Sequence, residues 1–145
     1  MDLSNFGCIM DFAEKIETEN EAFYNQAADH PACADQADLL AGLAKTAGKN
    51  INEAQRIRRE NVTEMILECV SDFTSYSYEI DSAIQADHTA DAIFAIARAV
   101  EVRAQRYYQD AAGKLNALPE VARNLKQLHK KHTRNLARLE NIQRS

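Results

Sequence analysis

Residues 99–112, AVEVRAQRYYQDAA, repeat the pattern of residues 15–28, KIETENEAFYNQAA, at an offset of 84 positions. This offset pairs Glu101 with Glu17 and Tyr108 with Tyr24. At about 100° per residue, each glutamate falls within the apolar sector of an amphipathic helix. The repeat therefore predicts two related helices, each of which directs a carboxylate towards the core.

Each of these predicted helices is followed by a turn and then by a second helix. The turns contain the only two prolines of the chain, Pro31 and Pro119, and proline suits the first turn of a helix because its missing N–H costs nothing there. An offset of 82 aligns the two second helices, and it pairs Leu43 with Leu125, Ala47 with His129, Asn50 with His132, and Ile57 with Leu139. The chain is thus predicted to be two αα-hairpins in tandem.

The segment between the hairpins is expected to cross the length of the bundle. Residues 62–70, VTEMILECV, can continue the second helix, whereas residues 71–81, SDFTSYSYEID, are poor in helix formers and predict a break. Thr89 is the candidate N-cap of the third helix, with Asp87 as the alternative.

These features predict an all-α protein, a ferritin-like four-helix bundle made of two αα-hairpins joined by a long crossover. We expect a single domain over residues 1–145, because a chain of 145 residues can bury a substantial core. The expected parts are a hairpin over 1–60, a crossover over 61–88 and a hairpin over 89–145. The expected helices lie near residues 3–28, 33–60, 89–116 and 119–143.

Charge, hydropathy and cysteine content exclude several classes of function. The net charge is −5, which makes a nucleic-acid partner unlikely on electrostatic grounds. The residues from Lys114 onwards include eight Lys or Arg and only two Glu. This excess of positive charge is typical of a solvated basic face on the last helix. No apolar run approaches a membrane span and no leader pattern begins the chain, so we expect a cytoplasmic protein without a membrane partner. The three cysteines form no C-x-x-C pair and signal neither a disulfide framework nor a zinc site.

The polar residues on the apolar faces form a pattern known from metal-binding bundles. In four-helix di-iron bundles, two helices supply one Glu each and the other two supply a Glu-x-x-His pair each. Here the first and third helices supply Glu17 and Glu101, and the fourth supplies His129 and His132 three residues apart. Carboxylates with imidazole suit iron and manganese. The four residues are therefore candidate metal ligands.

The order of these features resembles the ferritin-like superfamily, and in particular the helical domain of rubrerythrins. The resemblance covers most of the chain. It implies an oxo-bridged di-iron centre that reduces peroxide, and often a homodimer. No Cys-x-x-Cys pairs follow the bundle, so the rubredoxin-like electron-transfer module of that family is missing from this chain.

The resemblance transfers to individual positions only in part. His129 stands where the family has Glu, and Ala47 and Asn50 stand where it has Glu and His. By the same resemblance, Tyr24 and Tyr108 are groups that support the bound cofactor; the alternative is that they are core aromatics bonded to nearby carboxylates. The positions that match family ligands are Glu17, Glu101 and His132.

Three functions remain open on the sequence. The first is a rubrerythrin-like protein that binds iron, as one or two ions, at an incomplete di-iron site, with peroxidase activity if the site is competent. The second is a metal-free ferritin-like module that serves protein association. The third is recognition of a nucleic acid or an acidic partner by the outer face of the last helix, through Arg123, Lys126, Lys130, Arg134 and Arg138. A buried carboxylate needs a partner in any of them, and that partner is a metal, a histidine, Arg103 or a proton.

Overall fold

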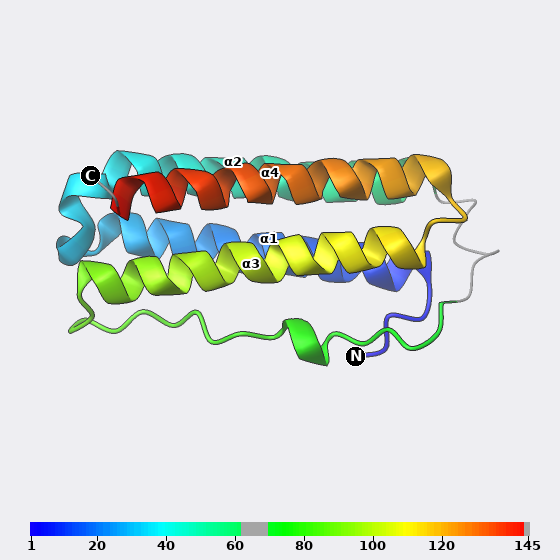
Figure 1. Ribbon diagram of the computed structural model, residues 1–145, viewed down its shortest axis with the longest axis horizontal. Helices are drawn as coiled ribbons and strands as arrows, with labels where there is room; N and C mark the ends of the chain where they lie inside the picture. Colours follow the sequence, from blue (N-terminus) through cyan, green and yellow to red (C-terminus); the bar gives the residue numbers. More distant parts are fainter. Residues whose placement is uncertain (62–69, 144–145) are drawn as a thin grey trace.

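The computed structural model describes residues 1–61 and 70–143, and it confirms the all-α four-helix bundle (Figure 1). No helix in these ranges is long and apolar enough to span a membrane. A 3₁₀ helix, η1 (Pro31–Gln36), joins the first two helices, and a second one, η3 (Tyr76–Tyr78), lies in the crossover. The four helices are α1 (Phe6–Asp29), α2 (Ala37–Glu60), α3 (Ala90–Lys114) and α4 (Pro119–Gln143).

Local capping sets where the helices begin. The side chain of Asn5 accepts a hydrogen bond from the backbone N–H of Cys8 at 2.8 Å, so α1 begins at Phe6, slightly later than predicted. Thr89 caps α3 by accepting from the N–H of Ala92 at 3.1 Å, which confirms Thr89 over Asp87. The start of α2 was predicted too early, because residues 31–36 form a 3₁₀ helix in which Cys33 leaves helical geometry (φ −108°, ψ 18°).

The crossover runs the length of the bundle beneath α1 and α3 (Figure 1). The predicted break over residues 71–81 is confirmed, since its only helical part is the short η3. The predicted continuation of α2 over 62–70 lies, apart from Val70, outside the described residues. Backbone hydrogen bonds attach the crossover to the N-terminal segment, including Leu3 N–H to the Phe73 carbonyl and Ser75 N–H to the Met1 carbonyl, each 2.9 Å.

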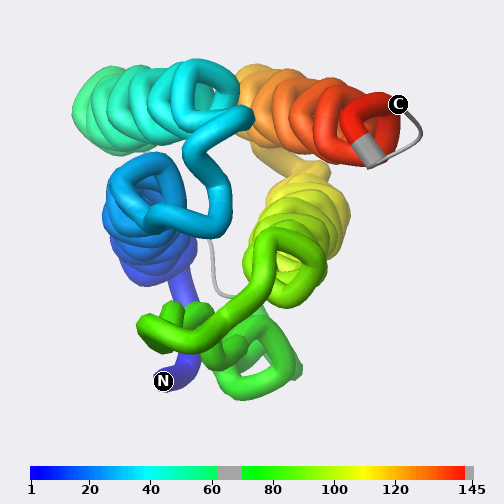
Figure 2. The backbone as a smooth tube through the Cα atoms, turned by 90° about the vertical axis from the view of Figure 1, so that its left-hand side faces the viewer, coloured from blue at the N-terminus to red at the C-terminus, as the bar shows by residue number. Residues whose placement is uncertain are grey.

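Viewed along the helices, the bundle has two levels (Figure 2). Helices α1 and α3 lie next to the crossover, and α2 and α4 form the opposite level. Within each hairpin the two helices pack closely against each other. One face of the bundle is therefore covered by the crossover, while the face formed by α2 and α4 has no covering segment in the described part of the chain.

The core consists of two apolar clusters with a polar layer between them. One cluster gathers buried side chains near the start of α1, among them Phe6, Ile9, Phe12, Ile57, Tyr107 and Leu125. The other gathers buried side chains near its end, among them Phe23, Leu40, Leu43, Ile93, Val100 and Leu139. Each fully buried large side chain stabilises the fold by about 1.5–3 kcal/mol. On every helix the two clusters are separated by buried polar positions: Glu17 and Asn20, Asn50, Glu101, and His132 and Asn135.

Candidate functional site

The repeated glutamates meet in this polar layer. Glu17 on α1 and Glu101 on α3 are both fully buried. The hydroxyl of Tyr24 donates to Glu101 Oε2 at 2.6 Å, and the hydroxyl of Tyr108 donates to Glu17 Oε2 at 2.7 Å. Each carboxylate is thus bound by the tyrosine of the other hairpin, and the internal repeat produces two crossed pairs.

His132 of α4 lies between the two carboxylates. Its Nδ1 is 2.7 Å from Glu101 Oε1, and its Nε2 is 2.8 Å from Glu17 Oε2. An ionised carboxylate only accepts hydrogen bonds, so contacts with two ionised carboxylates place a proton on each ring nitrogen. The ring also stacks on Tyr108, with the centroids 5.5 Å apart and 16° between the planes. His132 is therefore an imidazolium held between two buried anions.

The ionisation of the cluster follows from these contacts. Burial alone would lower the pKa of His132, but the two carboxylates raise the pKa to about 10. Burial alone would raise the pKa of Glu17, but His132, Tyr108 and Asn50 stabilise its charged form and lower the pKa. Burial, together with the adjacent carboxylate, raises the pKa of Tyr24 and of Tyr108 well above the usual value, so both hydroxyls keep their protons.

Helix α2, the remaining helix of the bundle, contributes Asn50 to the cluster. The sequence did not predict the role of this residue. Its Nδ2 donates to Glu17 Oε1 at 3.3 Å, and its amide oxygen is buried without a hydrogen-bond partner among residues 1–61 and 70–143. The available signal was the offset of 82, which placed Asn50 opposite His132 in the repeat. The two equivalent positions both contact Glu17, but only His132 also reaches Glu101.

Arg103 is not the partner of the two glutamates, although it was one of the predicted alternatives. Its guanidinium is buried and donates to Glu19 at 3.1 Å, to Asn20 at 2.9 Å and to the backbone carbonyl of Tyr78 at 3.2 Å. These contacts connect α1, α3 and the crossover. Arg103 therefore stabilises the level of the bundle next to the crossover.

The structure does not bring His129 into the cluster. This side chain is half-buried, and its Nδ1 lies 3.0 Å from the backbone carbonyl of Gln105 on α3. Of the predicted site residues, the structure brings together Glu17, Glu101, His132, Tyr24 and Tyr108, and His129 bonds elsewhere.

The residues present do not fit the di-iron centre that the resemblance implies. Both ring nitrogens of His132 face carboxylates, and α2 offers Ala47 and Asn50 in place of a Glu and a His. In the described ranges no group of three or more His, Cys, Asp or Glu is arranged to hold a metal ion. With Glu17, Glu101 and His132 at most 1% exposed, the cluster is suited to neutralising and connecting buried charges.

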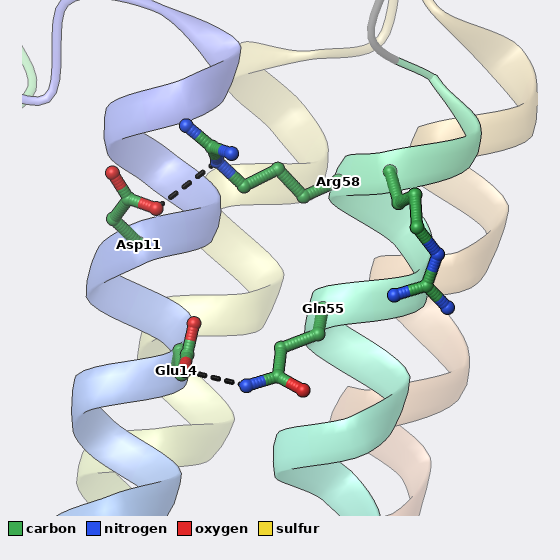
Figure 3. Close-up of a pocket in the computed structure, with 5 residues that line it drawn as sticks. Asp11, Glu14, Gln55 and Arg58 are labelled. Atoms are coloured by element: carbon green, nitrogen blue, oxygen red, sulfur yellow. Dashed lines mark hydrogen bonds and ion pairs between the residues drawn. The ribbon is translucent and has the colours of Figure 1, made fainter.

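A second polar region lies on the surface between α1 and α2 (Figure 3). This hollow of about 510 Å³ is lined by Arg59 and by four charged or amide side chains that form two pairs. Arg58 Nε is 3.0 Å from Asp11 Oδ1, and Gln55 donates to Glu14 at 2.7 Å. Exposed pairs of this kind contribute little stability, and their polar groups bond across the hollow instead of converging on a common point.

Comparisons of the chain with models of protein families, with curated proteins and with solved structures find no match.

Proposed function

We propose that the chain is a metal-free ferritin-like module that works by binding a protein partner and not by redox catalysis. The observation that carries this proposal is the double hydrogen bonding of His132, whose two nitrogens each lie within 2.8 Å of a carboxylate. An imidazolium has no lone pair to give to a metal. Its positive charge instead supplies the compensation that buried Glu17 and Glu101 require.

The partner contacts a mainly polar surface. In the described part of the chain, the large apolar side chains that are exposed are Met1, Tyr76 and Val102. Met1 lies in the N-terminal segment, which pairs with the crossover next to Tyr76, and Val102 lies on α3. Association through charged groups weakens as salt increases. A second copy of the chain, the partner that the resemblance implies, is the first to test.

Metal content and assembly state test the proposal together. Freshly purified full-length protein should contain only sub-stoichiometric iron, manganese or zinc by elemental analysis, and an anaerobic iron titration should not saturate. Sedimentation at low and high salt should show self-association that salt weakens. One or two tightly bound metal ions per chain, or a monomer at every concentration and salt, would overturn it.

Iron binding is the second candidate, and one observation favours it. Glu17, Glu101 and His132 converge from three helices, and the amide oxygen of Asn50 beside Glu17 has no partner. These groups would hold one ion if His132 released a proton and the side chains rearranged, since in the described ranges no three His, Cys, Asp or Glu are arranged to hold a metal as they stand. The same iron titration decides between the candidates, because this one requires saturation at one ion per chain, accompanied by proton release.

A further inference from the structure

A groove of about 350 Å³ lies between α2 and α4, on the face of the bundle opposite the crossover (Figure 2). It is separate from the paired hollow of Figure 3. Its volume is at the lower end of the range typical of small-molecule sites. The residues that line it include Lys49 and Asn50 of α2 and Lys131, Arg134, Asn135 and Arg138 of α4.

Four cations surround the groove, and its lining residues include neither Asp nor Glu. Over residues 1–61 and 70–143, none of the four forms an ion pair within 4.0 Å. The charge of Lys131 has a longer-range electrostatic effect on Glu53, whose carboxylate is bonded to Arg56. In the hollow of Figure 3, by contrast, Arg58 is paired with Asp11.

This concentration of positive charge is unfavourable for the isolated bundle. Lys131, Arg134 and Arg138 follow one another at i, i+3 and i, i+4 spacing on α4, and like charges at these spacings repel. The chain as a whole carries a net charge of −5, so the charge of the groove is opposite in sign to the net charge of the chain. An anion in the groove would relieve the repulsion.

The floor of the groove is polar and buried. Asn50 is 1% exposed and Asn135 is 6% exposed. The Asn50 amide nitrogen is directed at Glu17, and its oxygen has no donor. A buried acceptor without a donor is costly. A hydroxyl group in the groove beside Asn50 would supply the donor once the amide turned towards it.

We propose that this groove binds a small phosphate monoester that also carries hydroxyl groups. The arginine forks match phosphate oxygens in two-point geometry, and the lysines add point charges, so the four cations suit a dianion better than a single carboxylate. The hydroxyl groups bond to the amides of Asn50 and Asn135. The four cations of the groove take no part in the core cluster, so their binding of the phosphate does not depend on whether that cluster holds a metal.

Calorimetric titration of the full-length protein at constant ionic strength tests this proposal, with ribose 5-phosphate as the probe. Ribose and inorganic phosphate are the matched partial probes. Ribose 5-phosphate should bind more tightly than inorganic phosphate, and ribose should not bind measurably. The double variant Arg134→Gln/Arg138→Gln should weaken binding about tenfold or more, because it removes charge-assisted hydrogen bonds.

The control variant is Arg123→Gln/Lys126→Gln, which removes the same charge from exposed positions of the same helix outside the groove. Its affinity should match that of the wild type. Failure of ribose 5-phosphate to bind the wild type, or equal weakening in both double variants, would overturn the proposal. Equal affinity for inorganic phosphate and ribose 5-phosphate would also overturn it, because the floor would then make no contact with the ligand.

Discussion

The two hairpins supply the core cluster unequally. Their first helices, α1 and α3, contribute equivalent residues: a buried glutamate and, two turns later, a tyrosine that bonds the glutamate of the other hairpin. Their second helices contribute Asn50 and His132, which occupy equivalent positions but differ in charge and reach. The repeat thus creates two anionic positions, while a single residue of α4 supplies the cation between them. The charge balance of this core therefore depends on the position where the two hairpins differ, which holds Asn50 in the first and His132 in the second.

The largest expected effect comes from removing that cation. His132→Gln should lower the free energy of unfolding by about 3–5 kcal/mol, since it leaves two buried carboxylates without a charged partner. Urea unfolding followed by circular dichroism measures the loss. The control His129→Gln, at a half-buried position bonded only to the Gln105 carbonyl, should cost no more than about 1 kcal/mol. Equal losses in the two variants would show that His132 carries no special charge role.

The pH dependence of stability identifies the same cation. The pKa of His132 in the folded protein, about 10, lies above its ordinary value of 6.5. The charge of His132 therefore contributes fully to the free energy of unfolding below about pH 6.5, and this contribution is lost as the pH rises through 10. In that window wild-type stability should fall relative to His132→Gln by up to about 1.4 kcal/mol per pH unit. The pKa of Glu17 is lowered, so its contribution to the free energy of unfolding is lost as the pH falls into the acidic range. Tyr108 stacks on the ring and Tyr24 bonds Glu101, but both tyrosines keep their protons through the window.

Unfolding titrations of both proteins at several pH values between 5 and 10 make this measurement. Parallel curves for wild type and His132→Gln would contradict a charged imidazole in the core.

The equivalence of the glutamates can be tested directly. Glu17→Gln and Glu101→Gln each leave one carboxylate paired with the imidazolium, so each should cost no more than about 1–3 kcal/mol, or even stabilise the fold. Thermal melts of wild type and both variants should be unaffected by a chelator. If a chelator lowers the melting temperature of the wild type and not that of the variants, a metal bound to these carboxylates stabilises the native protein.

The sequence predicted the fold and much of the cluster because both follow from periodicity. The 3.6-residue pattern and the offset of 84 placed Glu17, Glu101 and the two tyrosines inside the bundle. The crossed pairing could not be predicted, because it depends on how α1 and α3 are aligned in space. His129 was placed in the site by its i, i+3 spacing from His132, but it bonds to the Gln105 carbonyl. Arg103 was one of the alternative partners of the buried carboxylates, but it bonds to Glu19, Asn20 and the Tyr78 carbonyl. Only the packed structure brings these groups near. The sequence showed that Asn50 differs from His132 at the equivalent position of the repeat, but it did not show that Asn50 contacts Glu17.

The smallest expected effect belongs to Asn50, the counterpart of His132. Its 3.3 Å bond to Glu17 is longer than a typical N–H···O contact, and its unpartnered oxygen already costs stability in the native state. Asn50→Ala removes both groups and leaves Glu17 bonded to His132 and Tyr108, so the net loss should be at most about 1 kcal/mol. The same urea titration measures this loss beside that of His132→Gln. A loss for Asn50→Ala as large as that for His132→Gln would mean that α2 and α4 support the carboxylates equally, and that the asymmetry between the two hairpins has no energetic consequence.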